Sequence, residues 1–194
     1  MANHVYYYVS AYGKVDALKT VYEKLLPMKT NIDSTTEADP TDVIKDLYGI
    51  TEEVEDTYSF FVEHVGAKWC HIEDIDNYSE KGDEEGQLSF SGYSAWSPPE
   101  ALLAQIYKLI YEQDNDAVMS MHHDDEAYNF VGAFQYVAGE AHEWYMENDD
   151  LIAQGFLARE DPEDEDSYLE MNWDMLEEER ERWSDRIISA NKTN

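Results

Sequence analysis

The sequence contains two short runs of residue types that bind metal ions, HHDD at residues 122–125 and the pair Cys70-His71. Imidazole, thiolate and carboxylate groups are the usual ligands of zinc. Because His122 and His123 are adjacent, they point to opposite faces of a strand, and one site does not easily use both. A site that combines His71, one of these histidines and Asp124 requires the two hairpins to be neighbours in a sheet. We prefer an ordinary polar hairpin here, and the sequence predicts no metal and no cofactor.

Carboxylate pairs at residues 74–76 and 83–85 are the arrangement used for general acid–base catalysis. A chain with 44 acidic residues contains such pairs by chance. The sequence has no glycine-rich phosphate loop, no G-x-S-x-G, no C-x-x-C and no H-E-x-x-H. We therefore predict no catalytic residues and a protein that is not an enzyme. A metal-dependent enzyme at the His122/His123 hairpin stays as the less favoured alternative.

Tyrosines gather in the first predicted strand, residues 4–13, where Tyr6, Tyr8 and Tyr12 share one face. Ferredoxin-like sheets bind single-stranded RNA by stacking bases on aromatic side chains of an open face. Such sites also need a basic groove, and none is evident in this sequence. We prefer the interpretation that these tyrosines lie under a covered sheet.

The charge of the chain is the strongest clue to its partners. Against 44 acidic residues stand 13 basic ones, so the formal net charge is −31, and no Lys or Arg occurs between Lys108 and Arg159. Binding to phosphates depends on Lys and Arg, so direct binding of nucleic acid is disfavoured. The field of such a surface attracts basic patches on other proteins. The alternative is that the acidity only maintains solubility.

The length of 194 residues suits one domain with an appended tail. The single cysteine, Cys70, cannot form an internal disulfide. The sequence shows no signal peptide and no long apolar run, so we expect a cytoplasmic protein that does not bind membranes.

Periodicity predicts the elements that would position these residues. Strands are expected at 4–13, 68–76, 87–95, 117–124 and 128–137, and residues 141–147 are either a further strand or the start of a helix. Helices are expected over 15–26, from Asp39-Pro40 to Gly49, from a Thr51 cap to Gly66, and after Ser97-Pro98-Pro99, where Ser97 and Glu100 form a capping box.

A composition shift near Arg159 introduces a solvated acidic linker and a helix over 168–188, which we expect to pack back on the domain or on a second copy of it. The order of elements predicts an α+β protein with an antiparallel sheet and helices on one face. This is the ferredoxin-like arrangement, plus an acidic C-terminal helix. We assign residues 1–158 to this domain, with a helical insertion near 39–65, and residues 159–194 to the linker and C-terminal helix.

Three short motifs, GAKW at 66–69, SAWSPP at 94–99 and FVGAFQYVAGE at 130–140, occur in this order. In these three motifs the chain resembles the small phage and plasmid proteins with an Api-type (Api92-like) ferredoxin-like domain. The resemblance covers roughly residues 4–146. The sequence departs from the pattern of these proteins at Cys70-His71, directly after Trp69, and at His123-Asp124-Asp125-Glu126. The resemblance implies an accessory protein of a mobile element, with a host cytoplasm as its location, and supplies no catalytic residues.

From charge and resemblance together we expect a non-enzymatic accessory protein that binds and inhibits a basic, nucleic-acid-binding host protein of defence or DNA processing, as a DNA mimic. The carboxylates expected to meet the partner's Lys and Arg are Asp114, Asp116, Asp124, Asp125, Glu126, Asp161, Glu163, Asp164, Glu165 and Asp166. The alternative is a homo-oligomeric structural protein, a homodimer for example, whose acidity serves solubility and whose interface contains Trp173 and Trp183.

Overall fold

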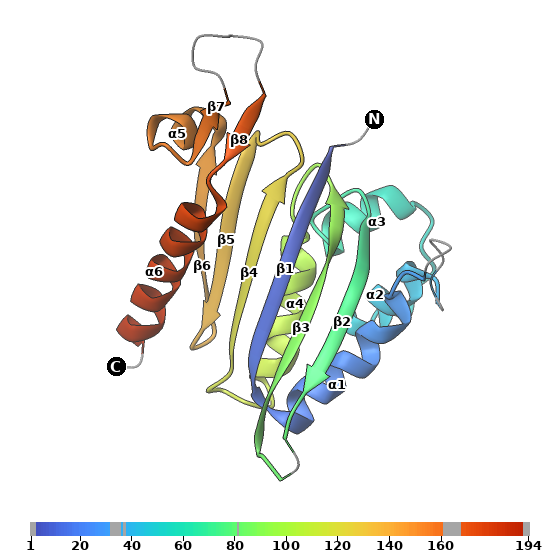
Figure 1. Ribbon diagram of the computed structural model, residues 1–194. Coiled ribbons are helices and arrows are strands. Elements are labelled where there is room, and N and C mark those ends of the chain that lie inside the picture. Colours follow the sequence, from blue (N-terminus) through green and yellow to red (C-terminus); the bar gives the residue numbers. More distant parts are fainter. Residues whose placement is uncertain (1–2, 32–35, 37, 81, 161–167, 192–194) are drawn as a thin grey trace.

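The computed structural model describes residues 3–31, 36, 38–80, 82–160 and 168–191. Its centre is a six-stranded antiparallel sheet with the order β2-β3-β1-β4-β5-β6 (Figure 1). The strands are β1 (His4–Lys14), β2 (Cys70–Tyr78), β3 (Glu85–Ala95), β4 (Val118–Asp125), β5 (Phe130–Val137) and β6 (Glu140–Glu147).

The first four strands have the ferredoxin-like topology. Helix α1 (Val15–Leu25) leads from β1 into the β2–β3 hairpin, and α4 (Glu100–Tyr111) leads from β3 to β4. This βαββαβ order places β1 and β3 in the middle of four strands, as the pairing shows. Strands β5 and β6 extend the sheet as a meander. The α+β fold class is therefore confirmed, and residues 141–147, which the sequence left open between strand and helix, belong to a strand.

Two further helices lie in the first crossover, α2 (Pro40–Tyr48) and α3 (Thr57–His64), after a short 3-10 turn (Leu26–Met28). Helix α2 begins as predicted, because the Asp39 side chain accepts a hydrogen bond from Thr41 N, and it ends at Gly49 with a left-handed backbone. The predicted Thr51 cap is wrong. Asp56 caps α3, with its carboxylate accepting from the backbone of the first turn.

The predicted capping box of α4 is also wrong. Helix α4 begins at Glu100 without a side-chain cap. Ser97 Oγ instead donates a hydrogen bond to Gly66 O at 2.6 Å and ties the start of α4 to the end of the preceding helical segment. A serine before two prolines satisfies a distant carbonyl here rather than the helix N-terminus.

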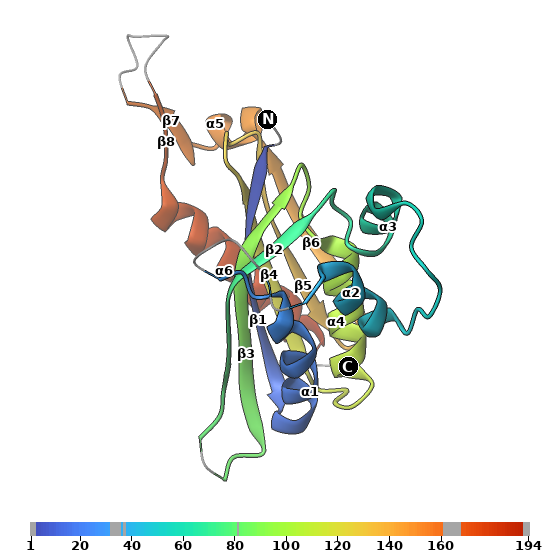
Figure 2. The same cartoon turned by 90° about the vertical axis from the view of Figure 1, so that its right-hand side faces the viewer.

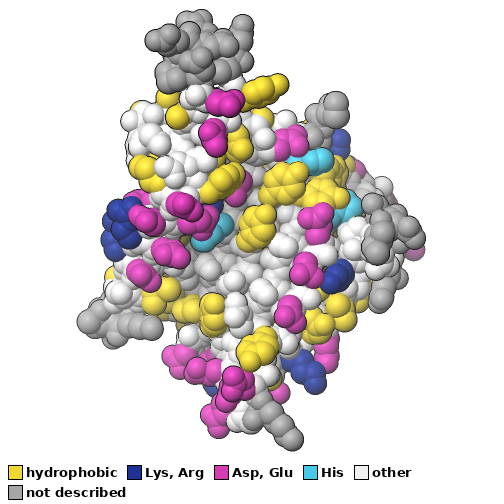
Figure 3. Space-filling view, in the orientation of Figure 1, with side chains coloured by type: hydrophobic (Ala, Val, Ile, Leu, Met, Phe, Trp, Pro, Cys, Tyr) yellow, Lys and Arg dark blue, Asp and Glu magenta, His cyan; other side chains and the backbone are white. Residues whose placement is uncertain are grey.

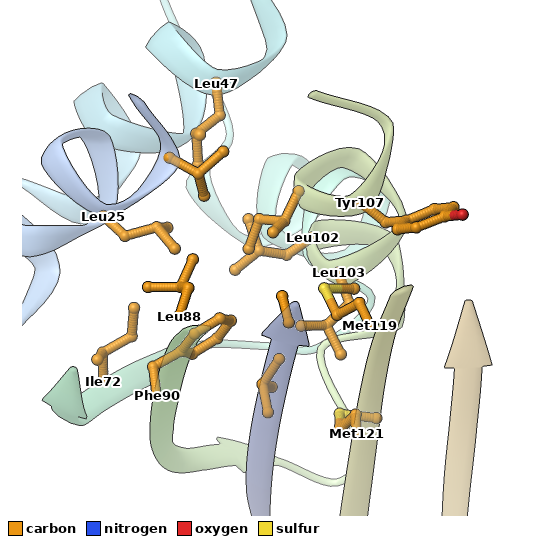
Figure 4. Close-up of a cluster of buried hydrophobic side chains, with 14 of the residues drawn as sticks. Leu25, Leu47, Ile72, Leu88, Phe90, Leu102, Leu103, Tyr107, Met119 and Met121 are labelled. Carbon is orange, nitrogen blue, oxygen red and sulfur yellow. The ribbon is translucent and has the colours of Figure 1, made fainter. Parts of the chain in front are cut away.

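The main hydrophobic core lies between the sheet and helices α1 to α4, which all cover one face (Figure 2). From β1 the side chains of Val5, Tyr7, Val9 and Ala11 point into this layer and are buried. Figure 4 shows Leu25, Leu88 and Leu102 meeting there from a helix, a strand and a second helix. Full burial of one such side chain contributes about 1.5–3 kcal/mol.

The C-terminal segment folds back on the sheet, which is one of the two packings that the sequence left open. It consists of α5 (Asn148–Ala153), the hairpin β7 (Leu157–Arg159) and β8 (Leu169–Met171), and α6 (Trp173–Asn191). The start of the predicted helix is a strand, so α6 begins at Trp173. A second apolar cluster joins this segment to β5 and β6, through Val131, Leu151 and Leu176 among others. None of the described helices has the length and apolar character needed to cross a lipid bilayer.

Candidate functional site

Helix α6 covers only part of the sheet face that is opposite α1 to α4. It packs over β4 and β5, where Arg180 donates to His123 O at 3.1 Å and Ser184 donates to the Gln135 side chain at 2.6 Å. In front of β1, β3 and β2, Figure 1 shows no helix. The face is thus divided into a covered half and an uncovered half, and we call the uncovered half, formed by β2, β3 and β1, the open half-face.

Arg180 is the polar anchor of the covered half. Its side chain is buried, forms an ion pair with Asp124, and bonds Glu177 at 2.8 Å. Burial raises the pKa of Asp124, and the neighbouring guanidinium of Arg180 opposes that shift. Burial and the same guanidinium lower the pKa of His122, whose Nδ1 lies 3.4 Å from Glu177 Oε2. This group of charges fixes the position of α6 on the sheet.

The histidines do not converge on a metal site. His122 faces α6, whereas the buried His123 lies on the other face between Phe130 and Phe134. Burial, with the charge of Arg180, lowers the pKa of His123 to about 3, so its ring is neutral. Strand β1 separates the two hairpins in the sheet, so His71 is not a neighbour of either histidine. Within the described residues, no three His, Cys, Asp or Glu side chains are grouped to hold a metal ion.

The open half-face consists of paired rows of side chains. Register forms four rows, which are Tyr6–Tyr93, Tyr8–Ser91, Ser10–Ser89 and Tyr12–Gln87. The β2 residues that continue these rows are His71, Asp74, Asp76 and Tyr78. The interpretation of a covered sheet is wrong for this half, because Tyr8 is 59% exposed, and Tyr6 and Tyr12 are exposed too. A sheet face with several exposed tyrosines is an unusual surface for a protein to leave uncovered.

Aromatic rings form a continuous cluster at one end of the open half-face. The ring centroids of Trp69 and Tyr93 are 5.8 Å apart, and those of His71 and Tyr93 are 5.1 Å apart. His4 is 5.5 Å from Trp69, and Tyr6 is 6.4 Å from Tyr93. Rings at these distances touch one another, so the cluster is a platform and not a cage with space between its walls.

A shallow hollow of about 230 Å³ lies in the middle of the open half-face. Its lining includes the side chains of Tyr8 and Asp74, with the small residues Ser10, Ser89 and Ser91. The hollow exists because the small serine side chains do not fill the space between the larger side chains of β1 and β2.

Carboxylates border the open half-face on several sides (Figure 3). Along β2 the exposed acids are Glu73, Asp74 and Asp76, and α6 supplies Glu177 and Glu181 beside His122. Strands β1, β2 and β3 contain no arginine and one lysine, Lys14, which is paired with Asp114. Lys29 reaches the β2 border, where its Nζ lies 2.8 Å from Asp74 Oδ1. Carboxylates therefore predominate among the charged groups around the exposed aromatic side chains of the open half-face.

Three of the carboxylates predicted to bind a partner are buried inside the protein. Asp114 accepts a hydrogen bond from Lys14 N at 2.7 Å, and Asp125 accepts from Ala127 N and Asn129 N at the β4–β5 turn. Asp124 is the partner of Arg180. These side chains stabilise the fold and are not available at the surface.

The other predicted carboxylates are at the surface or outside the described residues. Asp116 is exposed, and Glu126 is exposed with His4 Nδ1 at 3.2 Å. Asp161, Glu163, Asp164, Glu165 and Asp166 lie outside the described residues. Of the two tryptophans proposed for an oligomer interface, Trp183 is buried within the protein, and Trp173 is 43% exposed.

Sequence reasoning missed Arg180 as an anchor, although a signal was present. Arg180 interrupts the apolar stripe of the last helix between Leu176 and Trp183, the two side chains that pack inward. A charged residue within an apolar stripe indicates a buried ion pair, and an acidic residue on the facing strand is its natural partner. The border acids of β2 were noticed only as a candidate catalytic pair.

The fold and this surface define an acidic α+β protein with a ferredoxin-like sheet that is covered on one half of its second face. No protein-family model matches the sequence, and no curated protein matches it either. The crystal structure of a protein api92 from Yersinia pseudotuberculosis is similar, with 15% sequence identity and a TM-score of 0.33. The match covers 61% of this chain and 39% of that one, so it spans about two fifths of that protein's length.

Proposed function

We propose that this protein is a non-enzymatic, acidic interaction protein that binds a basic, nucleic-acid-binding protein and inhibits it by occupying its nucleic-acid-binding surface. The observation that carries the proposal is the acidic border around an uncovered, aromatic sheet face. Charges of one sign around a rigid surface raise the association rate of a partner with the opposite sign. The partner that fits best is therefore one whose own binding surface is rich in Lys and Arg.

The charge of the chain supports the same partner. With a formal net charge of −31, the protein on average repels nucleic acid and other acidic proteins. A basic surface that binds DNA phosphates also accepts carboxylates, and both interactions weaken as salt rises. The exposed Asp116 and Glu126 and the acidic run 161–166 belong to the carboxylates that we assign to this contact.

The motif resemblance adds a setting to the proposal. A mobile-element accessory protein in a host cytoplasm meets DNA-processing and defence proteins, many of which present basic clefts. The proposed role is a DNA mimic of this kind, with no reaction catalysed.

A capture experiment tests the proposal. The purified protein is immobilised and exposed to a host lysate, then washed at low and at high salt, with and without duplex DNA as competitor. We expect a nucleic-acid-binding protein that stays at low salt and is released by salt and by duplex DNA. Capture of proteins that neither high salt nor duplex DNA releases, or capture of no protein, contradicts the proposal. Either result favours a protein whose acidity only maintains solubility.

A further inference from the structure

We propose that the open half-face binds an extended lysine- or arginine-rich segment of a protein, whose cationic side chains stack on Tyr6 and Tyr8 and pair with Asp74 and Asp76. The inference rests on the proposed function, because it assigns the basic partner to one surface of the molecule. It also names the chemistry of the contact, which the net charge alone does not.

The hollow in the open half-face has the chemistry to receive one cationic side chain. Tyr8 supplies an aromatic ring and Asp74 a carboxylate that is 75% exposed, while the hydroxyls of Ser89 and Ser91 accept further N–H groups. Planar guanidinium groups stack on aromatic rings and bond carboxylates at their edge. Lys29 Nζ pairs with Asp74 Oδ1 at the border of the hollow, so a bound cationic side chain shares this exposed carboxylate with Lys29.

The spacing of the tyrosines fits an extended segment. Side chains on one face of a strand repeat every two residues, about 6.6–6.8 Å apart. Tyr6 and Tyr8 are two residues apart on β1, and a peptide that lies extended along β1 presents every second side chain at the same interval. A sequence that alternates a cationic and a small residue therefore places successive cations on successive tyrosines.

The protein already contains one contact of this type. Lys68 Nζ lies 4.8 Å from the centroid of the exposed Trp96 ring, just beyond the end of β3. Cation–π contacts at exposed positions contribute about 0.5–1 kcal/mol each. Several in a row, together with ion pairs, give useful affinity with a strong dependence on salt.

Charge decides between the basic segment and other occupants of the surface. A second copy of this chain would bring its own carboxylates against those of β2 and α6. Single-stranded nucleic acid would stack on the tyrosines, but its phosphates would meet Glu73, Asp76 and Glu177 instead of the basic groove that such binding needs. The ring cluster also lacks the internal space of a cage for a single methylated ammonium group.

The test uses the whole protein and a fluorescent peptide of twelve residues in which arginine and serine alternate. The first variant, Tyr6→Ser with Tyr8→Ser, removes the two aromatic rings on which the cationic side chains are proposed to stack. Its control is Tyr58→Ser on α3, because Tyr58 is 51% exposed on the other face. The second variant, Asp74→Asn with Asp76→Asn, removes two border charges. Glu53→Gln with Glu63→Gln makes the same charge change at exposed positions on the helical side.

We expect each open-face variant to weaken peptide binding about five- to tenfold, and each control to change it less than twofold. Equal weakening by open-face and control variants overturns the assignment to this surface but leaves the proposed acidic function standing. Absence of peptide binding by the wild type overturns both. Binding of single-stranded oligouridylate that is lost in the tyrosine variant, without binding of the peptide, identifies a nucleic-acid platform and overturns the inference.

Discussion

Replacing Arg180 by methionine should release α6 from the sheet, and the structure gives the size of the effect. Arg180 donates to Asp124, to Glu177 at 2.8 Å, and to the carbonyl oxygens of His123 and Gly132. Methionine keeps much of the apolar stem but leaves Asp124 buried without its cation. Breaking a buried ion pair in this way costs about 3–5 kcal/mol. Glu177 is half exposed, so its share of the loss is small.

The assay is denaturant unfolding at pH 7, monitored by tryptophan fluorescence, with hydrogen exchange to follow α6. For a chain of this length a loss of 3–5 kcal/mol corresponds to a fall of roughly 6–20 °C in Tm. Arg182→Met is the matched control, since it removes the same charge from an exposed position on the same helix. We expect it to cost less than about 1 kcal/mol.

A double variant separates the buried charge from the lost packing. With Arg180→Met, the further change Asp124→Leu removes the stranded carboxylate, so the double variant should be more stable than Arg180→Met alone. A loss below about 1 kcal/mol for Arg180→Met, or simple addition of the two single losses in the double variant, would show that this ion pair does not hold α6 in place.

Three further predictions follow from buried groups. The pKa of His123 falls from about 6.5 in the unfolded chain to about 3 in the folded protein, so between these values only the unfolded state binds the proton and stability falls as the pH drops below 6.5. Between pH 7 and pH 5 the wild type should therefore lose about 2 kcal/mol more than His123→Leu in urea unfolding. Equal losses in the two proteins would contradict this prediction. A Cβ at Gly92 would lie 1.9 Å from His71 O, so Gly92→Ala should cost more than about 2 kcal/mol in the same assay, whereas a near-neutral result would show that β2 can move away. Burial raises the pKa of the Cys70 thiol to about 12, so a disulfide reagent at pH 8 should label it only after unfolding, and prompt labelling of the folded protein would show that the thiol is accessible.

The parts of the fold that depend on local pattern could be predicted from the sequence. Alternation along β1 placed Tyr6, Tyr8 and Tyr12 together on one face, and helical periodicity after Ser97-Pro98-Pro99 predicted α4. The order of strands and helices was sufficient for the ferredoxin-like topology, because few arrangements satisfy short connections and right-handed crossovers. The start of α4 was misplaced because the hydroxyl of Ser97 bonds Gly66 O, a group distant in sequence.

The open half-face could not be predicted, because it depends on where α6 lies on the sheet. The sequence indicated that the last helix packs back but not which strands it covers, and that position is set by contacts from Arg180 and Ser184 to β4 and β5. The burial of Asp114, Asp124 and Asp125 was missed for a related reason. Acidic residues in a run look alike in sequence, and only the neighbours supplied by Lys14, Arg180 and the β4–β5 turn distinguish them.

A hydroxyl-radical footprint of the tyrosines, in the free protein and with the basic partner obtained by capture, is the most direct test of the proposed binding surface. Tyr8 and Tyr58 are similarly exposed, 59% and 51%, on opposite faces of the molecule, so each serves as the reference for the other. We expect the bound partner to lower the oxidation of Tyr8 several-fold and to leave that of Tyr58 unchanged. Protection of Tyr58 with Tyr8 unchanged, or protection of neither, would contradict the claim that the open half-face is the binding surface.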